Sequence, residues 1–405
     1  MQQKHWKKHF YTLWAGQTVS LLTSSVTQYA LLWHLTQRTG SAAVLSLAAL
    51  MGFLPMAIFG PFTGSLADRW DRRRIMIAAD AAIAGAALVL VVWGTGGALP
   101  IPLIYGALFL RALGTAFHQP CLNAVTPLMV PAEELDRCAG RTQAFQSVST
   151  LVSPALAALL YSLMPLNLLI GLDVLGAVAG VLAVLLAHIP PAPREKAFEK
   201  AHVFRDTLEG LKYLHRQKGL FALTMVATLL SFAYIPAAGL YPLMVLNRFG
   251  GTTAHAGIIE TGFSVGMLLG GVVLSALRGP KRRIFLMAAS LLAIGLTITG
   301  MGLLPPEGLI AFGVLTLLSG LAAPFFQGLF MALLQRKVRP DYLGRAMGVS
   351  GSLMSLACPL GLAAAGAMAE TWGAPVWFIT GGLLCVLCAG LCMLVRAVRH
   401  VDESP

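Results

Sequence analysis

Long apolar segments separated by short charged loops repeat along all 405 residues of the chain. The run 42–66 contains no ionisable side chain, and in the run 75–93 only Asp80 interrupts the apolar pattern. A helix needs about 20 apolar residues to cross the hydrocarbon core of a membrane, whereas a barrel strand needs only about 10. Because backbone groups cannot stay unpaired in lipid, segments of this length predict transmembrane helices.

The pattern predicts an all-α polytopic membrane protein with twelve membrane spans. The first apolar segment follows a lysine-containing N-terminus, but it is too long for a signal peptide and has no small-residue cleavage site. We therefore expect it to be the first span. The predicted spans are residues 10–35, 42–66, 75–94, 101–124, 139–163, 166–188, 219–246, 255–277, 284–303, 308–333, 346–368 and 373–395.

An internal repeat divides the chain into two halves. The triplet FHQ at 117–119 matches FFQ at 325–327, at an offset of 208 residues. Residues 1–189 and 219–405 are therefore expected to form two six-helix halves related by pseudo-symmetry. The connection 190–218 is expected to be a cytoplasmic linker whose amphipathic helix lies on the membrane surface or is solvated. Three apolar residues of this helix share one face: Phe204, Leu208 and Leu211.

Composition and charge support a membrane protein and orient it. Charged residues make up 11% of the chain, against about 25% in a soluble domain. Of the 29 Lys and Arg, 26 fall on one side of the predicted topology, Arg38 and Arg248 fall on the other, and Arg111 lies within a predicted span. By the positive-inside rule, the side that carries most of the Lys and Arg is cytoplasmic, and both termini are expected on that side. The net charge of +12 is then a topology signal, and no nucleic-acid partner is expected.

The sequence gives no sign of a metal or cofactor site. The six cysteines fall in or beside predicted helices, so we expect them to pack and not to form a disulfide framework. Cys385, Cys388 and Cys392 share a helix face, but no His or carboxylate lies near them in sequence to complete a metal site. The chain also lacks a phosphate-binding Gly-x4-Gly-Lys-Ser/Thr motif, so ATP is not expected to be the direct energy source.

The most distinctive motif is GSLADRWDRRR at residues 64–74, a charged loop between two apolar spans. It resembles the loop that the major facilitator superfamily places between its second and third spans. The segments 10–80, 111–131 and 340–359 further resemble the macrolide-efflux members of that superfamily. The resemblance implies a bacterial inner-membrane exporter of amphiphilic, erythromycin-like macrolide antibiotics, driven by proton antiport and conferring resistance. It also implies contact with membrane lipid and functional pairing with an ABC-F-type resistance protein.

The charged loop is expected to act as a gate. The Asp68 carboxylate can accept hydrogen bonds from a neighbouring helix N-terminus, whose dipole favours anions, and can pair with Arg72 or Arg73. Such contacts would tie the two halves together on the inner side while the outer side is open. The alternative is that these charges only anchor the topology. The expected gating residues are Gly64, Asp68, Arg69, Arg72 and Arg73.

Ionisable residues inside the predicted spans are candidates for proton coupling, because a charge at a helix centre costs about 2.5–3.5 kcal/mol on translocon scales. Arg111 lies close to the midplane of span 4, and the resemblance associates an arginine in this helix with proton coupling. Its candidate partners are Asp173 on span 6 and Glu260 on span 8. Asp80 on span 3 is a further candidate, although the sequence favours a structural role for it beside the arginines at 72–74.

Polar and aromatic residues of spans 1, 4, 7 and 10 are candidates for the substrate cavity, because these spans line it in the superfamily. Polar groups in lipid-buried helices face a cavity or bond to a neighbouring helix, and both interpretations stay open. Aromatic side chains would form the apolar wall that a bulky drug needs, or simply pack. The candidates are Gln17, Gln28, His118, Gln119, Phe232, Tyr234, Phe325 and Phe326.

Two other functions remain open from the sequence. Related branches that export a siderophore or another endogenous metabolite share the loop motif. A membrane-embedded lipid-modifying enzyme would instead need a paired His and acid at a membrane face, and His118 is followed by Gln-Pro-Cys-Leu-Asn. We therefore expect a transporter and no enzyme activity.

Overall fold

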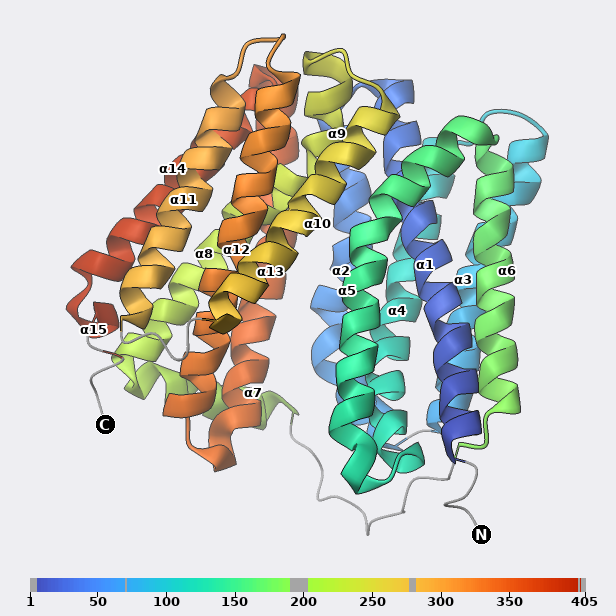
Figure 1. The fold of residues 1–405 in the computed structure, drawn as a ribbon, viewed down its shortest axis with the longest axis horizontal. Coiled ribbons are helices and arrows are strands. Elements are labelled where there is room, and N and C mark those ends of the chain that lie inside the picture. Colours follow the sequence, from blue (N-terminus) through green and yellow to red (C-terminus); the bar gives the residue numbers. More distant parts are fainter. Residues whose placement is uncertain (1–5, 70, 190–202, 277–281, 400, 402–405) are drawn as a thin grey trace. The chain divides into compact units, whose positions relative to one another are not determined.

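The computed structural model describes residues 6–69, 71–189, 203–276, 282–399 and 401, and the regular elements in these ranges are all helices (Figure 1). Up to residue 189 they are α1 (Trp6–Thr39), α2 (Ala42–Arg69), α3 (Arg72–Thr95), α4 (Ile101–Met129), α5 (Ala132–Leu163) and α6 (Leu166–Leu186). From residue 203 they are α7 (Val203–Arg216), α8 (Lys218–Gly239), α9 (Tyr241–Leu243), η2 (Met244–Arg248), α10 (Thr253–Ala276), α11 (Arg283–Leu303), α12 (Leu309–Lys337), α13 (Pro340–Trp372), α14 (Ala374–Leu394) and α15 (Arg396–Arg399). The all-α polytopic architecture predicted from the hydrophobic pattern is confirmed.

Ten helical segments in the described ranges are long and apolar enough to cross a membrane. The two other predicted spans correspond to α1 and α5, which are more polar. α5 has a shorter apolar segment, Val148–Leu163. α1 carries polar side chains along its length, among them Gln17, Ser24 and Gln28. Polar side chains in such a helix need partners inside the protein, and several of them contribute to the candidate site described below.

Helices continue past the predicted ends of four spans. The sequence predicts loops at 125–138 and 334–345, but the structure leaves only residues 130–131 and 338–339 outside helices. The polar residues that follow each span include good helix formers such as Glu, Lys and Arg. They carry no hydrophobic signal, so the apolar pattern underestimates the length of these helices.

The internal repeat is visible in the helix bounds. α4 and α12 each contain 29 residues, and their corresponding ends lie 208 positions apart. α6 and α14 each contain 21 residues, with the same separation at both ends. This is the offset at which the FHQ and FFQ triplets match, so the duplication extends from a short motif to whole helices.

Contacts divide the chain into two compact units. The first unit contains Met1–Leu35 and Met51–Ala201, and the second contains Thr36–Leu50 and His202–Pro405. The start of α2 thus belongs to the second unit and the remainder of α2 to the first. The half boundaries expected from the sequence stay a prediction.

In the first unit, α3 packs against α4 and α6, and small residues bring α6 close to α1. A Cβ atom added at Gly176 would overlap Thr23, and one added at Gly180 would lie 3.1 Å from Asp80 Oδ2 and 3.3 Å from Ser20 Cβ. Small residues four apart are a common means of close helix approach in membranes. The two glycines of α6 let α1 approach closely enough for its polar face to contact Asp80 on α3.

In the second unit, small residues serve the same purpose. Gly266 and Gly270 of α10 lie against the backbone of α12, and Gly320 of α12 lies against Phe263 in return. Gly262 has open space beside it, so two of the three glycines in the sequence motif 262–266–270 make the close contact. All six cysteines of the chain are buried in helices with free thiols, and Cys388 and Cys392 belong to the core of this unit.

A helix, α7, lies within the segment 190–218 that was predicted to be the linker, and one of its faces packs on the second unit. Leu214 is fully buried in the core of that unit, and the Tyr213 ring stacks on Tyr342 with centroids 4.6 Å apart. Glu209 Oε2 accepts a hydrogen bond from Arg345 Nη1 at 2.8 Å. Leu208 and Leu211 are exposed, and the side chain of Phe204 lies outside the described residues.

The predicted span 219–246 is divided into three elements: α8, α9 and the π-helical η2. Pro242 cannot donate a backbone hydrogen bond and its ring crowds the carbonyl four residues earlier, so a regular helix is interrupted here. The wider turn is closed by a bond from Phe249 N to Met244 O at 3.1 Å. This break places Asn247 beside the turn between α1 and α2.

Candidate functional site

A buried ion pair joins three helices of the first unit. Arg111 on α4 pairs with Asp173 on α6 through Nη1 and Oδ2. Arg111 Nη2 donates to the Ser24 carbonyl on α1 at 2.9 Å, and Ser24 Oγ donates to Asp173 Oδ1 at 2.7 Å. Arg111 is 5% exposed and Asp173 is 0% exposed. Both carboxylate oxygens of Asp173 therefore have partners, one of them a permanent cation.

A second polar cluster surrounds Asp80 on α3. Gln17 Nε2 on α1 donates to Asp80 Oδ2 at 3.2 Å and to the Gly180 carbonyl on α6 at 3.4 Å. His118 Nε2 on α4 lies 3.5 Å from Asp80 Oδ1, within ion-pair distance when the imidazole is protonated. That nitrogen makes no hydrogen bond of good geometry with any described residue. Asp80 is 3% exposed and His118 8% exposed, so both lie away from bulk solvent.

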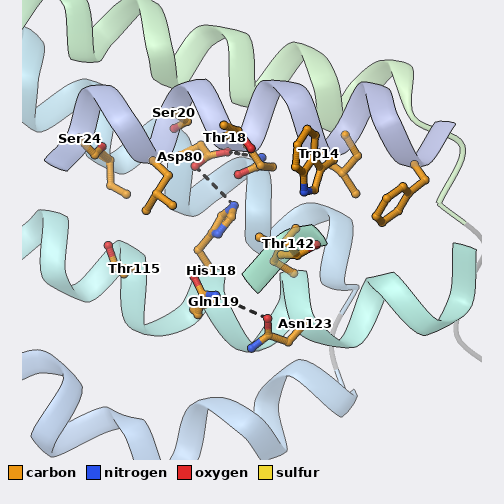
Figure 2. Close-up of a pocket in the computed structure, with 16 residues that line it drawn as sticks. Trp14, Thr18, Ser20, Ser24, Asp80, Thr115, His118, Gln119, Asn123 and Thr142 are labelled. Atoms are coloured by element: carbon orange, nitrogen blue, oxygen red, sulfur yellow. Dashed lines mark hydrogen bonds and ion pairs between the residues drawn. The ribbon is translucent and has the colours of Figure 1, made fainter. Parts of the chain in front are cut away.

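A pocket in the first unit opens beside these side chains. Figure 2 shows Asp80 and His118 pointing toward one another, with Gln119 and Asn123 on the α4 side and Trp14 on α1. The pocket has a volume of about 110 Å³, whereas drug sites usually enclose about 300–1,000 Å³. It accommodates an ionic or polar group, and a whole bulky drug needs additional space. The other lining residues are Phe10, Leu13, Gln17, Thr18, Ser20, Leu21, Ser24, Ile83, Thr115, Leu122 and Thr142.

The contacts of Asp80 differ from those favoured by the sequence. We expected a structural partnership with arginines 72–74, but the described contacts of Asp80 are with Gln17 and His118. Arg73 Nη2 instead donates to the Leu185 carbonyl at 2.9 Å, and Arg74 pairs with Asp71 at 3.4 Å. Asp80 lies two turns into α3, which carries its side chain away from the loop and toward α1 and α4.

The charged loop is only partly described. The surroundings of Gly64 and the side chains of Asp68 and Arg69 are not among the described parts of the chain, so the predicted gating contacts stay a prediction. Asp71 caps α3 by accepting from the Arg73 backbone N–H at 3.0 Å. Arg73 binds a carbonyl in the last turn of α6, where a cation is favourable. Arg72 is the first residue of α3.

The remaining candidates lie outside this pocket. Gln28 lies beside Gly52 of α2 in the first unit. In the second unit, the Phe232 ring contacts Trp377, and the Tyr234 ring contacts Phe263. Phe326 is buried in the core, where its ring stacks on Phe330 at 6.0 Å. Phe325 and Glu260 are half-buried, on α12 and α10 respectively.

Several pocket residues were missed by the sequence reasoning. Asn123 lies one helical turn after Gln119, and their side-chain amides meet at 3.5 Å. Thr115 lies one turn before Gln119, so a search of α4 at steps of four residues would have found both. No sequence pattern marks Trp14 and Thr142 as pocket residues. The packing of the helices decides which of their faces points toward the pocket.

Paired charges inside membrane helices, beside a pocket that is partly lined by polar side chains, are features expected of a multi-pass membrane transporter. Solved transporters share the fold. A nucleoside transporter matches 96% of this chain and 100% of its own, with a TM-score of 0.80 and 14% identity. A D-xylose–proton symporter matches 95% and 97%, with a TM-score of 0.73 and 13% identity. At such identities the likeness shows the fold alone.

The chain matches the transmembrane secretion effector family of the major facilitator superfamily over residues 5–405, and it belongs to that family. It is 46% identical over 398 residues to Macrolide efflux protein A of Streptococcus pyogenes, and the match covers 98% of each chain. Identity to Macrolide efflux protein A of Enterococcus faecalis is 47% over 323 residues, covering 80% of this chain and 100% of that one. Multidrug efflux pump Tap of Mycobacterium tuberculosis is 27% identical over 414 residues, covering 96% and 92%. The resemblance predicted from the sequence is confirmed.

Proposed function

We propose that this protein exports macrolide antibiotics across the bacterial cytoplasmic membrane in exchange for protons. The observation that carries the proposal is the 46% identity, over 98% of both chains, to a protein named for macrolide efflux. Buried acids in the first unit supply groups that can take up and release a proton. The protein acts as a transporter, and we assign it no enzyme activity.

Asp80 is our proposed proton carrier. Asp173 is held between Arg111 and Ser24, so its negative charge is balanced in a fixed way. Asp80 has no arginine or lysine among its described contacts, and its partners there are the amide of Gln17 and the imidazole of His118. Its carboxylate therefore has no fixed counter-charge among these contacts. Arg111 and Asp173 then hold α1, α4 and α6 in register, and Glu260 remains the candidate acid of the second unit.

The pocket beside Asp80 is the proposed polar part of the substrate cavity. Gln17, His118 and Gln119 line it, and we assign Gln28, Phe232, Tyr234, Phe325 and Phe326 to the wider cavity. In this proposal Gly64, Asp68, Arg69, Arg72 and Arg73 gate the cytoplasmic side. Both termini are cytoplasmic, residues 1–189 and 219–405 act as the two moving halves, and 190–218 links them. Functional pairing with an ABC-F-type resistance protein rests on family resemblance.

A transport assay in cells tests this function. Cells that express the protein should accumulate less labelled erythromycin than cells with an empty vector, and a protonophore should abolish the difference. Asp80→Asn should accumulate drug like the empty vector. The control Glu307→Gln, at an exposed acid between α11 and α12, should export normally.

Two outcomes would contradict the proposal. Equal erythromycin accumulation with and without the protein removes the macrolide assignment, and protein-dependent export of a catecholate siderophore would then support the alternative substrate class. Normal export by Asp80→Asn, at equal membrane abundance, would transfer the coupling role to Glu260.

A further inference from the structure

The helix α7 lies where the second unit enters the membrane (Figure 1). It ends at Arg216, and the membrane-crossing segment of α8 begins at Lys218. Earlier along α7, a Cβ atom added at Gly210 would lie 2.8 Å from the carbonyl oxygen of Arg345, where the membrane-crossing segment of α13 begins. Two points of α7 that are more than one turn apart are therefore at the membrane boundary, so the helix follows that boundary.

The face of α7 that points away from the second unit combines apolar and basic side chains. Leu208 is 50% exposed and Leu211 is 36% exposed. Lys212, His215 and Arg216 are exposed as well. At about 100° per residue, these five positions fall within an arc of about 140°. We call them the outer face of α7.

The protein leaves positive charge on this outer face without a counter-charge. Lys212 and Arg216 lie one helical turn apart, and neither pairs with an acid among the described residues. Glu209 of the same helix points to Arg345 instead, with which it forms an ion pair at 2.8 Å. Exposed leucines beside unpaired cations are typical of helices that lie in a membrane surface, with the apolar side chains among the acyl chains and the cations near the phosphates.

We propose that the outer face of α7 is a binding surface for anionic phospholipids of the cytoplasmic leaflet. Leu208 and Leu211 enter the acyl region, and Lys212 and Arg216 contact the phosphates of lipids such as phosphatidylglycerol. Charge complementarity identifies the occupant, because the cytoplasmic leaflet has a negative surface potential that attracts basic segments beside membrane helices. The surface depends on the cytoplasmic location proposed for the linker, and it does not depend on which drug is exported.

The test measures which lipid lies beside α7 and needs no drug. The full chain with Leu211→Cys carries a nitrobenzoxadiazole fluorophore at that position, in phosphatidylcholine nanodiscs that contain a small fraction of spin-labelled lipid. Each Lys or Arg near an anionic membrane contributes a preference of about fivefold. Spin-labelled phosphatidylglycerol should therefore quench the fluorophore about fivefold more than equally dilute spin-labelled phosphatidylcholine. The double variant Lys212→Gln, Arg216→Gln should remove this difference.

Two controls show whether the preference belongs to this face. The double variant Lys7→Gln, Lys8→Gln removes the same charge from exposed positions of α1 and should leave the preference at residue 211 intact. A fluorophore on Leu163→Cys should be quenched equally by both lipids, because Leu163 is 71% exposed and residues 142–172 include no charged residue. The parent chain, whose six cysteines are buried, gives the labelling background.

Equal quenching of residue 211 by the two lipids would overturn the proposal. Absence of quenching by either lipid would also overturn it, because the outer face would then be in water. A further measurement needs no change at Lys212 or Arg216: raising the salt concentration from 0.1 M to 1 M shortens the Debye length from about 10 Å to about 3 Å and should weaken the preference. A preference that is unchanged by salt would contradict recognition through these charges.

Discussion

At the scale of single residues, two acids buried in the same unit have different surroundings and therefore different expected roles. Asp173 is paired with Arg111 and accepts a hydrogen bond from Ser24. Asp80 meets an amide and an imidazole beside a pocket. Removing one partner of a buried ion pair leaves an uncompensated charge and typically costs about 3–5 kcal/mol. Changing the charge of Asp80 should cost less, because its described partners tolerate a neutral acid.

Variants of the ion pair separate its structural role from a transport role. Asp173→Asn should lower thermal stability in detergent strongly, by about 3–5 kcal/mol, because Arg111 is left unpaired in the membrane. The double variant Arg111→Met, Asp173→Met removes both charges and should recover most of this loss. We expect the double variant still to export erythromycin poorly, because α1, α4 and α6 lose their register. Normal export would show that the pair only stabilises the fold, and an unchanged melting temperature for Asp173→Asn would contradict the observed pairing.

The sequence was sufficient to find Arg111 and to name Asp173 among its candidate partners. It left Glu260 equally open, because residue numbers give the depth of a side chain along its helix and not the direction in which it points. The same limit explains Asp80, whose closeness in sequence to three arginines suggested a partnership that helix packing does not allow. The contacts that decide its role come from α1 and α4, 38 or more residues away in the chain.

At the scale of helices, the close approach of α1 and α6 depends on glycine. Gly176→Ala should lower thermal stability by about 1–3 kcal/mol, because the added methyl group overlaps Thr23. Thr23→Ala in the same chain should restore most of the loss by making room. Gly171→Ala on the same helix meets open space and should leave stability unchanged or slightly higher. Equal effects of the alanines at 176 and 171 would contradict the packing of α6 on α1.

The hydrophobic pattern predicted the helices well where they cross lipid and poorly where they leave it. The apolar centres of these helices could be predicted because a run of about 20 apolar residues is the length that a helix needs to cross the hydrocarbon core. The extensions of α4, α5, α12 and α13 were missed because their ends are polar. Helix propensity favours a helix there, but no hydrophobic pattern marks it. The packed face of α7 depends on contacts between helices, which the pattern of one segment does not contain. The interruption at Pro242 follows from the proline itself and could have been predicted.

At the scale of the whole molecule, the distribution of charge predicts the topology, and the duplicated helices indicate the architecture. The 26 Lys and Arg on one side of the predicted topology account for most of the positive charge of the chain. The recurrence of whole helices at an offset of 208 residues supports a duplicated bundle. Neither feature identifies the substrate, which depends on the similarity to macrolide efflux proteins and on the chemistry of the pocket.

The energetics of transport test the central claim most directly. Macrolides such as erythromycin carry an amine that is protonated at neutral pH, so exchange of one drug cation for one proton moves no net charge. The membrane potential, about 2.3 kcal/mol per charge per 100 mV, would then contribute nothing. The pH gradient alone would drive export, at about 1.4 kcal/mol per pH unit. The measurement is loss of labelled erythromycin from loaded proteoliposomes under each gradient separately.

Acidifying the outside of these proteoliposomes should accelerate erythromycin loss, and a potassium–valinomycin potential at constant pH should leave the rate nearly unchanged. Protein reconstituted with Asp80→Asn should lose the response to pH. A rate of erythromycin loss that does not change with the pH gradient would contradict proton-driven export. A strong response of this rate to the membrane potential at constant pH would contradict one-for-one exchange.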